Sequence, residues 1–176
     1  MVKKQTVILL AAVLLAVIIT GGCINGSEVA ENDTVSVRYV GTFENGTVFD
    51  SNTGDDGKEP LQFIVGKQQV ISGFEKAVIG MKPNETKTVT LPTEEAYPYD
   101  PSRVVAFNKT EVVESLGSIP EVGHKLTLLN GNGGNMVGTV LEITDTEVII
   151  DFNGETAGKT LIFKITVVDV IKSGNN

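Results

Sequence analysis

The stretch GKQQVISGFEKAVIGM, residues 66–81, predicts a single short helix. Ser72 is expected to be the N-cap, with Glu75 three residues later, as a capping box requires. From Phe74 onward, apolar residues recur at i, i+3, i+4 and i+7, which predicts that one face of the helix is buried. Gly80 and the proline that follows it end the helix after about two turns.

Two apolar residues, Val70 and Ile71, stand just before this helix, where the chain is expected to be a loop. Loops usually run over the surface and are polar. The pair is therefore either a hydrophobic staple onto the helix or the lip of an apolar pocket.

The N-terminus predicts export. A basic start, MVKK, is followed by the apolar run TVILLAAVLLAVIIT and then by GGC, which is the order of a signal sequence. The run is shorter than the roughly 20 apolar residues of a comfortable membrane span. Residues 1–23 are therefore interpreted as a leader, and the polar residues 24–33 as a tether.

Cys23, the only cysteine, directly follows two glycines, which resembles the lipobox of prokaryotic lipoproteins. In that motif the cysteine carries the lipid; Thr20 departs from the leucine that is usual three places before it. The alternative is an uncleaved signal anchor. Both interpretations place the body of the protein outside the cell, anchored to the outer face of the cytoplasmic membrane.

The composition excludes several classes of function. The 176-residue chain has a formal net charge of -8 and scattered basic residues, so it is not expected to bind nucleic acid. One cysteine rules out an internal disulfide, and His124, the only histidine, cannot form a His-rich metal site. Nothing in the sequence demands more than a monomer.

Sequons that fit exposed loops of an exported protein follow the leader at Asn25, Asn32, Asn45, Asn84 and Asn108.

Alternating apolar residues predict the strands of an antiparallel sheet. These strand-like runs lie at residues 34–42, 61–66, 85–92 and 161–172. The sequence ENGT after the first run is a turn signal. Together with the single helix, this predicts an α+β fold.

The long stretch between residues 104 and 158 has a different character, with strand-like runs at 125–129, 136–143 and 148–152. No helical period stands out in it. It is predicted to be a small all-β module inserted into the parent domain.

Four segments resemble, in order, the body of an FKBP-type peptidyl-prolyl cis-trans isomerase. They are VSVRYVGTFENGTVFDSN, LQFIVGKQQVISGFEKAVIGM, EEAYPYD and LIFKITVVDV. The resemblance implies an antiparallel sheet curled round one short helix, formed by residues 34–103 and 159–172. Residues 104–158 are similar to the insert-in-flap domain of SlyD-like and archaeal members.

The resemblance also implies which residues line the site. By motif they are Tyr39, Phe49, Asp50, Phe63, Val70, Ile71, Phe74, Tyr97 and Phe163. Taken without the family, Phe63 and Phe163 could be plain core residues, Asp50 a turn cap and Tyr97 a surface residue.

The implied reaction breaks no bond and moves no proton, so we expect no nucleophile, metal or cofactor. In the family, the residue at Ile71 donates its backbone N–H to a substrate carbonyl, and the residue at Tyr97 contributes a hydroxyl. Phe74 replaces a common tryptophan, Pro98 a usual glycine, and the insertion displaces the flap on which macrolide affinity depends. The chain ends in IKSGNN and not in a His-rich tail, so no nickel role is expected.

In relatives the insertion binds unfolded chains and gives chaperone activity. Here its apolar residues either bind such clients or form the module's own core: Val104, Val105, Phe107, Val112, Val113 and Leu116. The leading hypothesis is an exported, membrane-tethered prolyl isomerase with folding-helper activity on proline-containing or unfolded polypeptides. The main alternative is an FKBP-shaped binding module with little turnover. A solute-capturing lipoprotein has little support.

Overall fold

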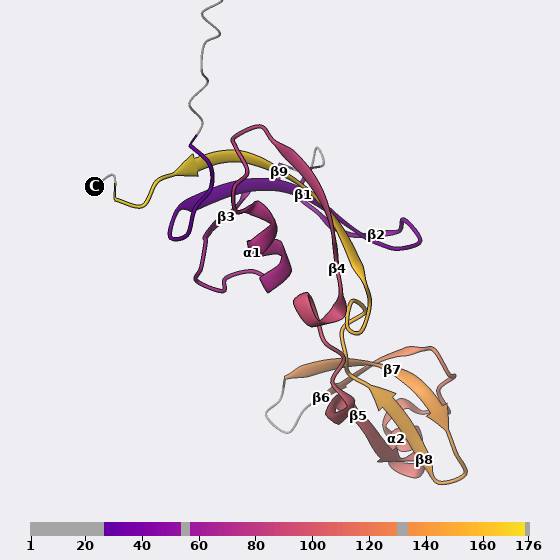
Figure 1. The fold of residues 1–176 in the computed structure, drawn as a ribbon. Coiled ribbons are helices and arrows are strands. Elements are labelled where there is room, and N and C mark those ends of the chain that lie inside the picture. The colour runs from indigo at the N-terminus through magenta and orange to yellow at the C-terminus, as the bar shows by residue number, and fades with distance from the viewer. Residues whose placement is uncertain (1–26, 54–56, 130–133, 175–176) are drawn as a thin grey trace, which may run out of the picture.

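The structure is a computed structural model that describes residues 27–53, 57–129 and 134–174. Two units follow one another in Figure 1, each built on an antiparallel sheet. The predicted leader and Cys23 lie outside the described residues. Within the described ranges, no helix is long and apolar enough to cross a membrane.

The first unit has a five-stranded sheet in the order β2-β1-β9-β4, with β3 also paired to β1. Its strands are β1 (Thr34–Phe43), β2 (Val48–Ser51), β3 (Leu61–Ile64), β4 (Thr86–Leu91) and β9 (Leu161–Ile171). Helix α1 (Ser72–Val78) lies inside the curve of this sheet (Figure 1). Two 3-10 turns, η1 (Thr93–Glu95) and η2 (Pro101–Arg103), lead out of the unit. The α+β architecture predicted from the sequence is confirmed.

Strand β9 supplies the centre of the first core. Its alternate residues Leu161, Phe163, Ile165 and Val167 are all buried, as their spacing predicts. The strand pairs with β1 along its whole length, from Thr34 opposite Ile171 to Phe43 opposite Leu161. The pairing of these two strands therefore fixes which side chains face α1.

Helix α1 has the predicted length, but the predicted capping box is wrong. The N-cap is Ile71, and its side chain makes no capping hydrogen bond. Ser72 Oγ instead donates to the carbonyl of Glu95, 3.3 Å away. Glu75 Oε1 accepts from the backbone N–H of Gly66 at 2.8 Å, so it closes the preceding loop. The Ser72 hydroxyl and the Glu75 carboxylate, which a capping box would use at the start of the helix, both bond to residues outside it.

The prediction of a tether over residues 24–33 is wrong for the part that the structure describes. Val29 is buried, its N–H donates to the carbonyl of Met81, and its own carbonyl accepts from Gly80. Asp33 is also buried and accepts hydrogen bonds from Ala30 N, Lys172 Nζ and Ser173 N. Polarity suggested a linker, because the few apolar residues among these ten form no helical or strand period.

The second unit has a four-stranded sheet in the order β5-β8-β7-β6 and a helix packed on it. The elements are β5 (Val104–Asn108), α2 (Lys109–Leu116), β6 (Lys125–Leu129), β7 (Asn135–Ile143) and β8 (Glu147–Asp151). The three predicted strand runs coincide with β6, β7 and β8, whereas β5 and α2 were not predicted.

Because of α2, the expectation of an all-β module is wrong. The helix begins at Asn108, whose side chain accepts from Thr110 N, and ends at Gly117, which has a left-handed φ of 73°. An Asn N-cap and a Gly C-cap are ordinary boundary signals. They were present in the sequence, but only Val112 of this short helix is fully buried, so the apolar period was weak.

The second unit is attached to the first at the end of the sheet opposite the N-terminal segment. The described chain begins beside the C-terminal end of β9, where Lys172 Nζ donates to the carbonyl of Glu28. The connections to the second unit run from the far end of β4 and into the start of β9 (Figure 1). The N-terminal segment and the second unit therefore lie at opposite ends of the β1–β9 pair.

We expect Asp33→Asn to lower the free energy of unfolding by about 1.5–3 kcal/mol at pH 7, the range for hydrogen bonds to a charged group. Burial opposes the Asp33 carboxylate, but Lys172 and two backbone N–H groups outweigh it and hold its pKa below the ordinary 3.8. A carboxyl group with a lowered folded-state pKa stabilises the fold above its unfolded pKa. The difference between wild type and variant should therefore shrink as the pH falls below about 4.

Urea unfolding at pH 7 and at pH 3 measures this difference. Asp169→Asn, on an exposed residue of β9, is the matched control and should change stability little at either pH. An Asp33→Asn loss that is equal at both pH values would contradict a role for the charged carboxylate.

Candidate functional site

Aromatic side chains from four strands and α1 meet in the curve of the first sheet. The Phe74 ring of α1 lies 5.5 Å from the Tyr39 ring of β1 and 5.3 Å from the Phe163 ring of β9, both edge to face. Phe49 of β2 and Phe63 of β3 extend the group, 5.6 Å from Phe163 and 6.0 Å from Phe74 respectively. We call these five residues the aromatic cup.

The cup has a buried floor and a partly open rim. Phe63, Phe74 and Phe163 are each at most 5% exposed, whereas Tyr39 and Phe49 are half-buried. The floor residues belong to the core of the first unit and also contact the rim rings. The two interpretations of Phe63 and Phe163, core or site, are therefore not exclusive, because one face of the same core remains open.

Gly41 makes room for the rim. A Cβ atom at this position of β1 would lie 2.6 Å from Cζ of Phe49 and 3.0 Å from the Phe163 ring. Real Cβ atoms essentially never approach another atom as closely as 2.6 Å. The absence of a side chain at Gly41 therefore lets the Phe49 ring lie across β1 and reach Phe163.

Val70 and Ile71 lie in the loop before α1, where the sequence predicts them. Both are half-buried and pack against the core of the first unit. Their packing on the core is the contact expected of a staple, and their exposed part keeps the pair a candidate for the lip of the site. Within the described part of the chain, the Ile71 N–H has no hydrogen-bond partner, whereas its carbonyl accepts from Glu75 N. The loop therefore presents a backbone donor beside an apolar surface.

A short hydrogen bond marks the polar side of the cup. The Tyr39 hydroxyl donates to Asp50 Oδ2 at 2.6 Å, and Asp50 Oδ1 accepts from Ser51 N at 2.8 Å. Burial raises the pKa of Tyr39 most, and the hydrogen bond and charge of Asp50 raise it further. Tyr39 consequently remains a neutral donor at physiological pH, and Asp50 acts as an exposed acceptor and not as a turn cap alone.

Tyr97 lies on the connection towards the second unit, with 43% of its surface exposed. Its carbonyl accepts from Gly158 N at 2.9 Å and from Thr93 Oγ1 at 3.1 Å. Tyr97 also makes a small contribution to the raised pKa of Tyr39. The structure thus holds its backbone firmly and leaves its side chain open to solvent.

Asn52 is a positioning residue that the sequence reasoning missed. Strand β1 pairs with β3 up to Val37 and with β2 from Val40, so residues between them lack a strand partner on that side. The buried Asn52 side chain fills this gap: Oδ1 accepts from Tyr39 N at 2.7 Å, and Nδ2 donates to the Val37 carbonyl at 3.1 Å. In sequence, an asparagine after a strand looks like any turn residue.

The rest of the described surface offers grooves but no metal site. Residues 27–53, 57–129 and 134–174 contain no group of three or more His, Cys, Asp or Glu placed to hold a metal ion. His124 pairs with Glu121 at 3.4 Å, and both side chains are exposed. A groove of about 420 Å³ runs along α2 and β6 in the second unit. We call it the α2 groove; it is lined by Phe107, Glu111, Val112, Ser115, Leu116, Thr127, Leu128 and Leu129.

Known proteins share this sequence over most of its length. The family described as FKBP-type peptidyl-prolyl cis-trans isomerase matches residues 26–168. The short-type peptidyl-prolyl cis-trans isomerase of Methanocaldococcus jannaschii is 35% identical over 153 residues, which cover 81% of this chain and 94% of that protein.

Two bacterial relatives agree. The FKBP-type isomerase SlyD of Aeromonas hydrophila is 34% identical over 145 residues, covering 81% of this chain and 65% of its own. The FKBP-type 16 kDa isomerase of Escherichia coli is 28% identical over 143 residues, which cover 81% of this chain and 93% of that protein. With the family match spanning both units and the aromatic cup in place, the chain belongs to the FKBP-type peptidyl-prolyl cis-trans isomerases.

Proposed function

We propose that this isomerase works outside the cell, tethered to the membrane, and that it also assists the folding of polypeptide clients. The family supplies the reaction. The observation that carries the location of the site is the aromatic cup, with Phe74 and Phe163 as a buried floor and Tyr39 on an open rim.

An X-Pro bond isomerises over a barrier of roughly 18–20 kcal/mol, because amide resonance is lost in the twisted state. Water stabilises the polarised planar amide more than the twisted one. Transfer of the prolyl ring into an apolar cup removes part of this advantage, and tighter binding of the twisted amide lowers the barrier further. Such catalysis requires an apolar aromatic surface and hydrogen-bonding groups in fixed positions. The aromatic cup of the first unit has the rings, and Tyr39, Asp50 and the Ile71 N–H are the polar groups beside them.

The polar groups at the rim have orienting roles. The unpartnered Ile71 N–H is placed to donate to a carbonyl of the bound peptide, next to the apolar lip that it forms with Val70. Tyr39 is oriented from two sides, through its hydroxyl by Asp50 and through its backbone by Asn52. Because the Tyr39 pKa is raised, these groups act by hydrogen bonding and not by proton transfer.

The α2 groove is the proposed capture surface for unfolded clients. Val112 is part of the second core, and Phe107 packs against it. Leu116 and Leu129 line the same groove with 37% and 76% of their surfaces exposed. The apolar residues of this unit are thus divided between its own core and an open surface, which supports both uses that the sequence suggested.

The positions of the N-terminal segment and the second unit support a membrane tether at the N-terminus. The N-terminal segment packs at one end of the β1–β9 pair, and the second unit lies beyond the other end (Figure 1). A membrane anchor in the leader would hold the first end near the lipid. The second unit, with its α2 groove, would then lie farther from the membrane than the N-terminal end of the first unit.

Replacement of Phe74 by leucine tests the cup. Phe74→Leu keeps an apolar side chain of similar size but removes the ring that contacts Tyr39 and Phe163. We expect kcat/KM for a short X-Pro peptide to fall about tenfold, equivalent to ~1.4 kcal/mol of transition-state stabilisation. Phe107→Leu in the second unit is the matched control and should keep the rate.

The isomerisation assay on residues 27–176 decides between the two main hypotheses. Acceleration by the folded wild type with loss in Phe74→Leu supports the cup as the catalytic site. No acceleration by the wild type, with circular dichroism showing an intact fold, would leave only the binding-module alternative.

Polar substitutions in the α2 groove test client capture. We expect Leu116→Ser combined with Leu129→Ser to keep the rate on short peptides but to slow catalysis of a proline-limited refolding reaction about tenfold, because ~1.4 kcal/mol of apolar contact is lost. Val168→Ser, at an exposed position of β9 in the first unit, is the control. Equal refolding rates in all three proteins would exclude the groove as the capture surface.

Cell fractionation tests export and the tether. In the lipoprotein interpretation, Cys23→Ser should release the protein from the membrane fraction, because the lipid acceptor is lost. In the signal-anchor interpretation, the same variant should stay in the membrane fraction with its leader uncleaved. Wild-type protein in the soluble fraction of the cytoplasm would refute both.

A further inference from the structure

The turn between β1 and β2 is built tightly around Asn45. Phe43 N donates to the Thr47 carbonyl, and Gly46 N donates to the Phe43 carbonyl, each at 2.9 Å. Gly46 has a φ of 83°, which closes the turn as a bulge and favours glycine there. Five consecutive residues, Phe-Glu-Asn-Gly-Thr, thus form one rigid hairpin tip.

Within this tip, the asparagine of a sequon is presented to solvent. Asn45 Oδ1 accepts from Thr47 N at 3.0 Å, which fixes the carboxamide plane. The Nδ2 atom has no hydrogen-bond partner within the described part of the chain. Asn45 and Thr47 are both exposed, so an enzyme can reach the amide nitrogen and the neighbouring hydroxyl together.

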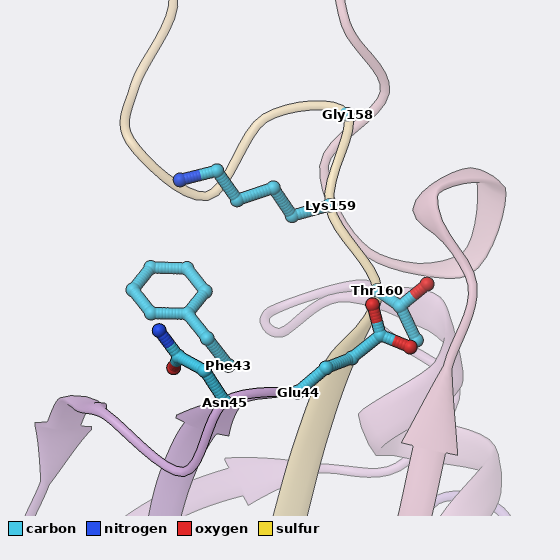
Figure 2. Close-up of a pocket in the computed structure, with 6 residues that line it drawn as sticks. All are labelled: Phe43, Glu44, Asn45, Gly158, Lys159 and Thr160. Atoms are coloured by element: carbon cyan, nitrogen blue, oxygen red, sulfur yellow. The ribbon is translucent and has the colours of Figure 1, made fainter.

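An aromatic platform lies beside this amide. Figure 2 shows the Asn45 carboxamide and the Phe43 ring on the same side of the turn, whereas Glu44 points to the other side. Phe49 lies 5.1 Å from the Phe43 ring, and the exposed Lys159 ammonium lies 4.6 Å from it. The polarised C–H groups of a sugar ring are attracted to an aromatic face in the same way as a cation is.

A cavity of about 400 Å³ opens over the platform. It is lined by Phe43, Glu44, Asn45, Gly158, Lys159 and Thr160 (Figure 2). A saccharide attached to Asn45 would enter this space directly, and the solvent-exposed Lys159 side chain can move aside for it. The cavity also supplies an ammonium, a carboxylate and a hydroxyl for hydrogen bonds to sugar hydroxyl groups.

The other described sequons lack an aromatic residue two places before the asparagine. Asn32 and Asn84 are exposed but have left-handed φ values of 66° and 67°, and neither has an aromatic residue two places before it. Asn108 shares the turn contact of Asn45, because its Oδ1 accepts from Thr110 N at 2.9 Å, but it is the N-cap of α2 and has Ala106 two places before it. The combination of a fixed sequon turn, an aromatic platform and an adjoining cavity occurs, among these four, at Asn45.

We propose that Asn45 carries an N-linked saccharide whose first sugar packs on Phe43. The proposal rests on the proposed export, because the transfer uses a lipid-linked saccharide donor at the outer face of the membrane. The Nδ2 atom of Asn45 bonds to the anomeric carbon, and the bond from that carbon to the phosphate of the lipid carrier breaks. One amide proton is lost as the lipid phosphate departs, and no oxidant or reductant is needed.

Mass spectrometry of the full-length protein from its native cells tests the modification. The tryptic peptide 39–58 should carry a saccharide mass, and Thr47→Val, which keeps the side-chain shape but removes the hydroxyl, should abolish it. The peptide 77–87, with Asn84, is the internal comparison and should be modified to a smaller fraction. Protease added outside intact spheroplasts reports export separately.

The outcomes distinguish the modification from export. An unmodified Asn45 on protein that external protease digests overturns the saccharide and leaves export intact. An unmodified Asn45 on protein shielded from the protease overturns both. Equal modification of Asn45 and Asn84 contradicts the role assigned to Phe43 in selecting the site.

A thermal measurement tests the packing on Phe43. The glycosylated and unglycosylated forms are separated from one preparation, and their Tm values are compared. We expect the saccharide to raise Tm by roughly 2–4 °C in a chain of this size. In Phe43→Leu the same comparison should give less than half of that rise, and because each difference is taken within one variant, any intrinsic loss from the substitution cancels. An unchanged rise would overturn the packing.

Discussion

Helix α1 spans Ser72–Val78, about 10 Å, whereas the strands β1 and β9 against which it packs are each roughly 30 Å long. The helix therefore cannot cover the whole concave face of the sheet. On this concave face, the buried rings of Phe74 and Phe163 lie next to the half-exposed rings of Tyr39 and Phe49. The candidate site is therefore continuous with the core of the first unit, against which its half-exposed rings pack.

The polar groups at the rim follow from the same sheet. Strand β1 changes partners between β3 and β2, and the gap is filled by the Asn52 side chain. That contact holds the backbone at Tyr39, and the Asp50 carboxylate on β2 accepts from its hydroxyl. A catalyst that breaks no bond depends on the placement of such groups, so a residue such as Asn52, which need not touch the peptide, matters through Tyr39.

The second unit is joined to the first by two chain segments that also bond to each other. Asn153 Nδ2 donates to the Asp100 carbonyl at 2.9 Å, and Asp100 N donates back to Asn153 Oδ1 at 3.1 Å. Tyr99 contacts the returning segment through Asp151 at 3.1 Å. The segment that follows Tyr97 is thereby tied to the chain that returns from the insertion.

The sequence by itself determined the antiparallel α+β fold, the length of α1, the buried face of β9 and the family, because these depend on local periodicity and on contiguous motifs. Only the tertiary structure decided the partners of polar groups. Ser72 and Glu75 bond to distant segments, Asp33 ties both ends of the unit together, and Asn52 completes β1. Their partners lie outside the local segment that carries them, from nine residues away for Glu75 to 139 for Asp33, and no local periodicity encodes such a contact.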